Sequence, residues 1–161
     1  MARSAIYATQ DPMQFIIDKV TKLRFDWNKR PLDETDFYRL CKRFKISVEE
    51  MPLSVGGFYY CLLGRHYIAV SSKLSEREKL FVMFHELGHY LLHVPQTGVT
   101  ANFHGIGKKT RIESEADIFA LCCIIPRQQI EAGTINELAE IDGFDEEKLA
   151  ARMAVYEKYG I

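Results

Sequence analysis

The sequence has no long apolar run, no excess of one charge and no paired cysteine motif, and each absence excludes a class of protein. No stretch approaches the ~20 consecutive apolar residues that a membrane helix needs, and the N-terminal region lacks the apolar core of a signal peptide. The 21 lysine and arginine residues are balanced by 22 aspartate and glutamate residues, so we expect no general attraction to nucleic acid. These absences predict a cytoplasmic protein that binds neither membranes nor, directly, nucleic acid.

The cysteines do not have the spacing of a structural zinc site. None belongs to a Cys-x-x-Cys pair, which excludes a zinc ribbon, and all lie in apolar runs, so we interpret them as reduced core residues. They are Cys41, Cys61, Cys122 and Cys123. A chain of 161 residues, 47% of them hydrophobic, is long enough for about one domain with a proper core.

The most informative feature that is present is the motif His-Glu-Leu-Gly-His at residues 85–89. Residues four apart lie on the same face of a helix, so His85 and His89 can bind one metal ion while Glu86 projects beside them. Zinc hydrolases combine two such histidines with a third protein ligand and a carboxylate that takes a proton from water. The alternatives are a chance match in a core helix and a motif with only a structural role.

The surroundings of the motif predict a long buried helix. Ser75 and Glu78 have the spacing of a capping box, which marks a helix N-terminus. Apolar residues then recur at helical spacing as far as Leu92, and Pro95 closes the segment. Gly88 costs a helix interior about 1 kcal/mol against alanine, which predicts that a strand, a second helix or a substrate backbone approaches closely there.

The third metal ligand is expected on a second helix that begins near Arg111. Glu113 and Asp117 share one face of this helix, while Glu115 points to roughly the opposite side, so only one glutamate can reach the metal. We favour Glu113, because Asp117 would then be placed to accept the N–H of a ligating histidine and fix its tautomer. Glu115 is the alternative ligand, and is otherwise expected to be an ordinary solvated acid.

Three blocks of the sequence resemble the ImmA/IrrE family of metallopeptidases. They are His-Glu-Leu-Gly-His-Tyr-Leu-Leu-His at 85–93, Glu-Ser-Glu-Ala-Asp-Ile-Phe-Ala at 113–120, and Ile-Pro at 125–126. The resemblance implies a gluzincin-like zinc site with Glu113 as third ligand. It also implies a protein partner, because members of the family cleave, or promote the removal of, helix-turn-helix repressors during stress or mobile-element induction.

The predicted reaction is metal-assisted hydrolysis of a peptide bond. Zn²⁺, or alternatively Mn²⁺, would be held by the two histidines of the motif and Glu113, and would polarise a water and the scissile carbonyl. Glu86 would take a proton from the water and deliver it to the leaving amine. Three side chains are candidates for the donor that stabilises the transition state: His66, Tyr90 and His104.

The order of elements predicts an α+β fold with a zincin-like metallopeptidase core and a small antiparallel sheet packed on helices. This domain is expected to span residues 1–133, with a short helical tail, residues 134–161, packed on it. Before the metal helix we expect two helices, one from residue 12 to about 27 and one from 33–35 to about 44. We expect three strands, one that begins at residue 46, one over 58–63 and one over 66–71. The last two strands should form a hairpin that turns at residues 64–65. We expect strand 66–71 to offer an edge to an extended substrate backbone.

Two other classes of function stay open. One is a zinc-stabilised regulator or antitoxin-like module that grips a partner without cutting it. The other is a DNA-binding regulator, because the tail resembles a helix-turn-helix, but its last helix has balanced charge where a DNA-reading helix should be basic. We therefore expect the tail to pack or to dock a partner. His93 is expected to lie outside the metal shell, as a polar contact at the helix C-terminus.

Overall fold

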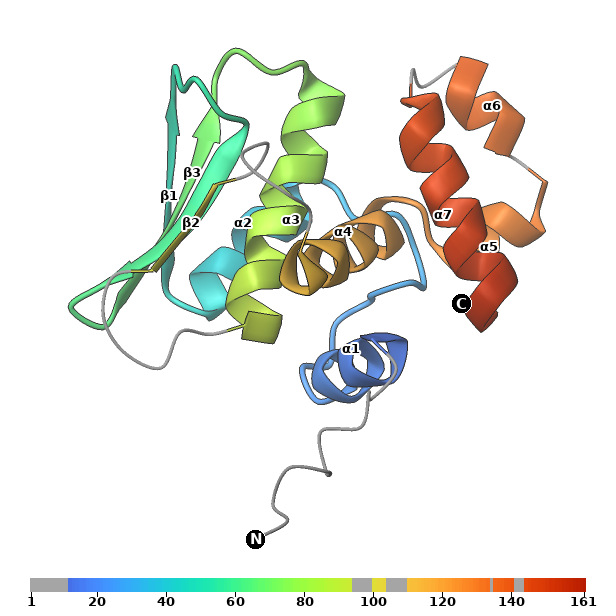
Figure 1. Cartoon of the computed structure of the whole chain (residues 1–161), viewed down its shortest axis with the longest axis horizontal. Helices are drawn as coiled ribbons and strands as arrows, with labels where there is room; N and C mark the ends of the chain where they lie inside the picture. The colour runs from blue at the N-terminus through green and yellow to red at the C-terminus, as the bar shows by residue number, and fades with distance from the viewer. Residues whose placement is uncertain (1–11, 94–99, 104–109, 134, 141–143) are drawn as a thin grey trace, which may run out of the picture.

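A computed structural model of the chain describes residues 12–93, 100–103, 110–133, 135–140 and 144–161. Figure 1 shows a sheet on one side of a central helix, a second helix crossing on the other side, and the C-terminal helices beyond it. The helices are α1 (Pro12–Thr21), α2 (Glu34–Arg43), α3 (Glu76–His93), α4 (Arg111–Ile124), α5 (Arg127–Glu131), α6 (Ile135–Glu140) and α7 (Glu146–Tyr159). The strands are β1 (Ile46–Met51), β2 (Gly57–Leu62), β3 (Arg65–Ser71) and β4 (Thr100–Phe103). The expected α+β class is confirmed.

The sheet is mixed, so the expectation of an antiparallel sheet is wrong. Its four strands run in the order β1-β3-β2-β4. β1 pairs in parallel with β3, with Ile46 opposite His66, whereas β2 is antiparallel to both of its neighbours. The physical reason is that β1 pairs with the far strand of the following hairpin. β3 is therefore an inner strand with no free edge, and the expected pairing of strand 66–71 with a substrate is also wrong.

The hairpin between β2 and β3 turns one residue earlier than the sequence predicts. Leu63 and Gly64 occupy its tip with φ values of 50° and 74°. Positive φ at both central residues is the conformation that matches the twist of a two-residue hairpin. Glycine adopts it without strain.

The first helix ends at Thr21, earlier than the expected end near Trp27. Arg24 and Asn28 adopt positive φ, which is incompatible with a continuing α-helix. The turn brings the indole of Trp27 onto Phe119 of α4, with ring centroids 6.3 Å apart and planes 11° apart. The partly buried Trp27 side chain therefore packs against α4 in the segment that follows the helix.

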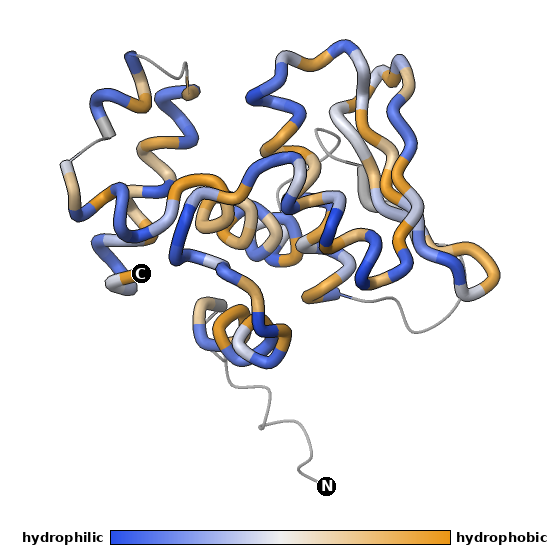
Figure 2. The backbone as a smooth tube through the Cα atoms, turned by 180° about the vertical axis from the view of Figure 1, so that it is seen from behind, coloured by the Kyte–Doolittle hydropathy of each residue, from blue (hydrophilic) through white to orange (hydrophobic). Residues whose placement is uncertain are grey.

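Helix α3 is the centre of the molecule and begins as the sequence predicts. Ser75 caps it: its hydroxyl oxygen accepts the backbone N–H of Glu78, and the Glu78 carboxylate accepts the backbone N–H of Ser75. Its middle turns are buried on all sides, because the sheet lies against one face and α4 against another. Figure 2 shows apolar stretches along these central elements, whereas α6 and α7 alternate between polar and apolar residues.

The C-terminal helix α7 is attached to α4 through a buried arginine. Arg152 is fully buried and donates hydrogen bonds to the backbone oxygen of Ile125 at 2.7 Å and to Oδ1 of Asn28 at 3.1 Å. Asp145 caps the N-terminus of α7 by accepting the backbone N–H of Glu147. None of the described helices is both long and apolar enough to cross a bilayer.

Candidate metal centre

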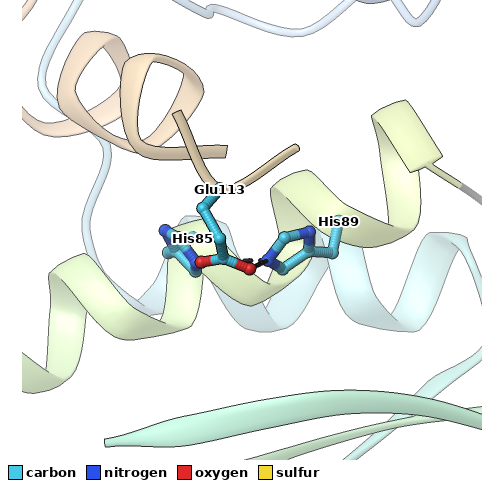
Figure 3. Close-up of side chains that lie close together, drawn as sticks. All are labelled: His85, His89 and Glu113. Carbon is cyan, nitrogen blue, oxygen red and sulfur yellow. Dashed lines mark hydrogen bonds and ion pairs between the residues drawn. The ribbon is translucent and has the colours of Figure 1, made fainter. Parts of the chain in front are cut away.

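Helices α3 and α4 bring together the side chains of His85, His89 and Glu113 (Figure 3). The histidines lie one turn apart on α3, and Glu113 lies in the first turn of α4. His85 Nε2 is 3.0 Å from Glu113 Oε2, His89 Nε2 is 3.0 Å from Glu113 Oε1, and the two Nε2 atoms are 3.2 Å apart. Two nitrogens and a carboxylate thus converge on one point.

The separation of these atoms fits a tetrahedral metal ion. Donors about 2.0–2.1 Å from a tetrahedral zinc lie about 3.3 Å from one another. The observed 3.0–3.2 Å is close to that value, so a small cation can enter with little movement of the helices. Two imidazoles and one carboxylate are the ligands of catalytic zinc sites, which keep a fourth position open. Calcium and magnesium prefer shells made only of oxygen.

Close approach of the two helices is what allows this convergence. A Cβ atom at Gly88 would lie 3.0 Å from Cδ1 of Phe119 and 3.4 Å from Cα of Ala116. The expectation that Gly88 marks a close approach is confirmed, and the neighbour is the second helix. Thr110 fixes the start of α4, because its side chain accepts the backbone N–H of Glu113.

Asp117 lies on the far side of the His85 ring from the cluster. Its Oδ1 is 2.7 Å from Nδ1 of His85, so Asp117 can hold a proton on Nδ1 and leave Nε2 as the ligand atom when a metal ion is bound. Burial lowers the pKa of His85, but the hydrogen bonds to Asp117 and Glu113 outweigh it and raise this pKa to about 9 in the metal-free protein. Burial likewise raises the pKa of Glu113, but hydrogen bonds from both histidines hold it well below the ordinary value.

Glu86 is completely buried on the side of α3 that faces β2. A Cβ on Gly57 would lie 3.6 Å from its Cγ, so the strand leaves room for this side chain. The backbone of Tyr59 favours the ionised form, yet within the described residues neither carboxylate oxygen makes a hydrogen bond of ordinary geometry. Burial raises the pKa of Glu86 to about 8. A buried carboxyl group without a full set of partners is characteristic of a functional site.

A chain of hydrogen bonds leads away from His89. His89 Nδ1 is 3.3 Å from His93 Nδ1, and His93 Nε2 is 2.7 Å from Glu115 Oε2. Nε of Arg111 donates to Glu115 Oε1 at 2.7 Å. The expectation that Glu115 is a solvated acid is wrong, because it is only 3% exposed. The sequence held one signal for this contact: His93 follows His89 at the same four-residue spacing.

Two of the three candidate transition-state donors lie together. His66 and Tyr90 belong to an aromatic cluster between the sheet and α3, in which the Tyr59 hydroxyl is 2.8 Å from Nδ1 of His66. The ring of Tyr90 meets that of His66 edge-on, with centroids 4.8 Å apart. His104 lies outside the described residues. Tyr59 was not among the predicted site residues, because it reads as an ordinary strand residue.

A cavity of about 300 Å³ opens beside the metal cluster, between α4 and α7. Asp117 forms part of its wall, so the cavity adjoins the partner of His85. Its apolar lining comes chiefly from Phe81, Ile118, Leu121 and Val155. Asp145, Glu147 and Lys148 lie among its polar lining residues. The carboxylates outnumber the cation, and that cation already contacts Asp145 at 3.5 Å.

Comparison with known proteins gives the same family as the motifs. Residues 41–158 match the family model of the IrrE N-terminal-like domain, Peptidase_M78, which covers most of the chain. A protein of Bacillus phage phi105 named uncharacterized immunity region protein 2 is 31% identical over 91 residues. That match covers 55% of this chain and 58% of the phage protein. The family match includes all the residues of the cluster, and the chain therefore belongs to the IrrE N-terminal-like domain family of ImmA/IrrE metallopeptidases.

Proposed function

We propose that this chain is a metallo-endopeptidase that hydrolyses a peptide bond in a specific protein partner. The observation that carries the proposal is the convergence of His85, His89 and Glu113, 3.0–3.2 Å apart, with the buried Glu86 on the same helix. Family membership supports peptide-bond hydrolysis over other reactions of such a cluster.

Zinc is the metal that these ligands fit best, with manganese as the alternative. When bound, the ion would supply Lewis acidity that polarises the scissile carbonyl and a water molecule. Glu86 is the general base: one of its oxygens takes a proton from the water as the water oxygen bonds to the carbonyl carbon. The same carboxyl group returns that proton to the amide nitrogen, so the C–N bond breaks and a neutral amine leaves.

The other residues of the centre hold this arrangement in place. The Asp117 carboxylate lies 2.7 Å from Nδ1 of His85 and can accept a hydrogen bond from Nδ1–H, which keeps Nε2 free to act as a ligand. Burial raises the pKa of Glu86 above its ordinary value in the metal-free protein. A bound cation would favour the ionised carboxylate, which is the form that takes a proton from water.

For the partner we propose a helix-turn-helix transcriptional repressor with an exposed linker. The ImmA/IrrE family supports this choice, and so does the name of the phage relative, which places that protein in an immunity region. The cavity beside Asp117 adds a physical argument. Its lining includes more carboxylates than cations, whereas repressors carry basic residues that contact DNA phosphates. A basic segment with an apolar side chain suits such a rim and lining.

The experiment is to search the neighbourhood of the gene for a helix-turn-helix repressor and to incubate that repressor with the zinc-loaded protein. We expect one specific cut, little digestion of unstructured casein, and no cut by Glu86→Gln, which should still bind zinc and the repressor. A wild type that binds the repressor without cutting it would favour the alternative, a zinc-stabilised regulator or antitoxin-like module without proteolysis. Rapid digestion of casein would contradict the proposed specificity.

A second experiment tests the cavity as the docking place. Ala151 lines the cavity and is exposed, and Ala154 is exposed three residues further along α7 without lining it. Ala151→Phe should raise the KM for repressor cleavage at unchanged zinc content, whereas Ala154→Phe should behave as wild type. Equal kinetics in the two variants would refute docking in the cavity. Deletion of residues 134–161 is less informative, because it would also remove the buried Arg152 that joins α7 to the core.

A further inference from the structure

We infer that His93 and Glu115 are positioning residues that hold His89 in the one tautomer able to bind the metal. The inference rests on the proposed metal site and goes beyond it, because neither residue is a ligand or touches the reacting atoms. It follows from the direction that each hydrogen bond in the chain His89–His93–Glu115 must take.

The first step is the orientation of the His89 ring. Its Nε2 atom faces the cluster, 3.0 Å from Glu113 Oε1 and 3.2 Å from His85 Nε2. A metal ion binds the lone pair of a neutral imidazole nitrogen, so the proton of His89 must be on Nδ1. An imidazole with its proton on Nε2 would point that hydrogen at the cation and would have no lone pair on Nε2 to bind it.

The second step is the acceptor for that proton. Nδ1 of His89 lies 3.3 Å from Nδ1 of His93. Since His89 Nδ1 is the donor, His93 Nδ1 has to be the acceptor, which places the proton of His93 on Nε2. That atom lies 2.7 Å from Oε2 of Glu115. An ionised carboxylate can only accept, so the whole chain has one consistent direction.

The third step concerns what holds the chain rigid. The other oxygen of Glu115 accepts the N–H of Arg111 Nε at 2.7 Å, so both carboxylate oxygens of Glu115 are held by hydrogen bonds. The side chains of His93 and Glu115 are 10% and 4% exposed, and the ring of Phe15 stacks on His93 with centroids 6.4 Å apart. With so little contact with solvent, water is a poor substitute for His93. Each histidine of the cluster therefore has its own carboxylate, directly for His85 and through His93 for His89.

The test measures zinc affinity by competition with a chromophoric chelator. His93→Leu should bind zinc 10–100-fold more weakly than the wild type, the usual range for groups that orient a ligand. His93→Gln should recover most of this loss, because its amide oxygen can accept from His89 while its amide N–H donates to Glu115. His66→Leu removes another half-buried histidine and should leave zinc affinity unchanged. Equal affinity in His93→Leu and wild type would overturn the inference.

A second measurement does not depend on any variant folding. Long-range ¹H–¹⁵N spectra of the imidazoles in the zinc-loaded wild type should show His89 protonated on Nδ1 and His93 protonated on Nε2 only. His93 protonated on Nδ1, or on both nitrogens, would overturn the inference. The proposed function and the positioning role can be refuted separately. A wild type that binds no zinc contradicts the proposed function, whereas a zinc-loaded wild type with the wrong His93 tautomer contradicts only the positioning role.

Discussion

Gly88→Ala should loosen both the fold and the metal centre, because the added methyl group meets α4. A Cβ at this position lies 3.0 Å from Cδ1 of Phe119 and 3.4 Å from Cα of Ala116. The Phe119 ring has little freedom to give way, since it is fully buried and stacks on Trp27. The Ala116 atom is backbone, so it moves only if the helix moves.

Two opposing effects set the magnitude. Alanine gains about 1 kcal/mol over glycine from helix propensity, whereas overpacking a tight core costs about 1–3 kcal/mol. Because the neighbours are a buried ring and a backbone atom, the cost of overpacking exceeds the gain in helix propensity. We expect the free energy of unfolding to fall by about 1 kcal/mol. For a chain of this length, that loss lowers Tm by about 3 °C. Glu113 lies one turn before Ala116, so the displaced helix should also lower zinc affinity by about tenfold.

The assay is urea unfolding of the metal-free protein together with a zinc competition titration. Gly64→Ala is the control: a Cβ there meets nothing within 4 Å, but φ is +74°. It should cost about 1 kcal/mol of backbone strain and leave zinc affinity unchanged. Gly88→Ala with wild-type affinity, or with higher stability than wild type, would refute the argument that this glycine is required by helix contact.

Two further predictions concern the metal ligands and a surface ion pair. Glu113→Gln should weaken zinc binding markedly and Asp117→Asn by an intermediate amount, about tenfold, as a competition titration would show; an Asp117→Asn protein with unchanged affinity would contradict its role beside His85. Arg30 holds the pKa of Asp36 at about 2, below its ordinary 3.8. The ion pair therefore stabilises the protein above pH 4 and is lost as pH falls from about 4 to 2. Since the Arg30 side chain is 46% exposed, we expect about 1 kcal/mol or less. Asp36→Asn should flatten that part of the pH–stability curve, and an unchanged curve would contradict the assignment.

The central part of the fold could be predicted because its signals are local. Ser75 and Glu78 form a capping box over three residues, and the two motif histidines need only one helical turn to converge. The close approach at Gly88 was also predictable, since an interior glycine in a helix needs a reason. These features depend on short stretches of chain and on spacing.

The features that could not be predicted depend on contacts between distant segments. Nothing in the strand beginning at Ile46 specifies that it pairs in parallel with β3, because that choice follows from how α2 and the hairpin pack. Glu115 was expected in solvent, because the prediction used only the helical spacing of residues in α4 and no neighbouring helix. The C-terminal end of α3 lies alongside α4, and His93 contacts Glu115 on the side of α4 that was expected to be exposed. The first helix likewise ends before Trp27, which contacts Phe119 in the distant helix α4.

If His85, His89 and Glu113 hold one metal ion beside Glu86, the metal content of the purified protein depends on these ligands. Elemental analysis of the wild type, Glu86→Gln and His89→Ala after mild purification measures this content. We expect about one equivalent of zinc in the first two proteins and none in His89→Ala. Full retention of zinc by a folded His89→Ala protein, or a folded wild type that takes up no divalent metal, would contradict this expectation.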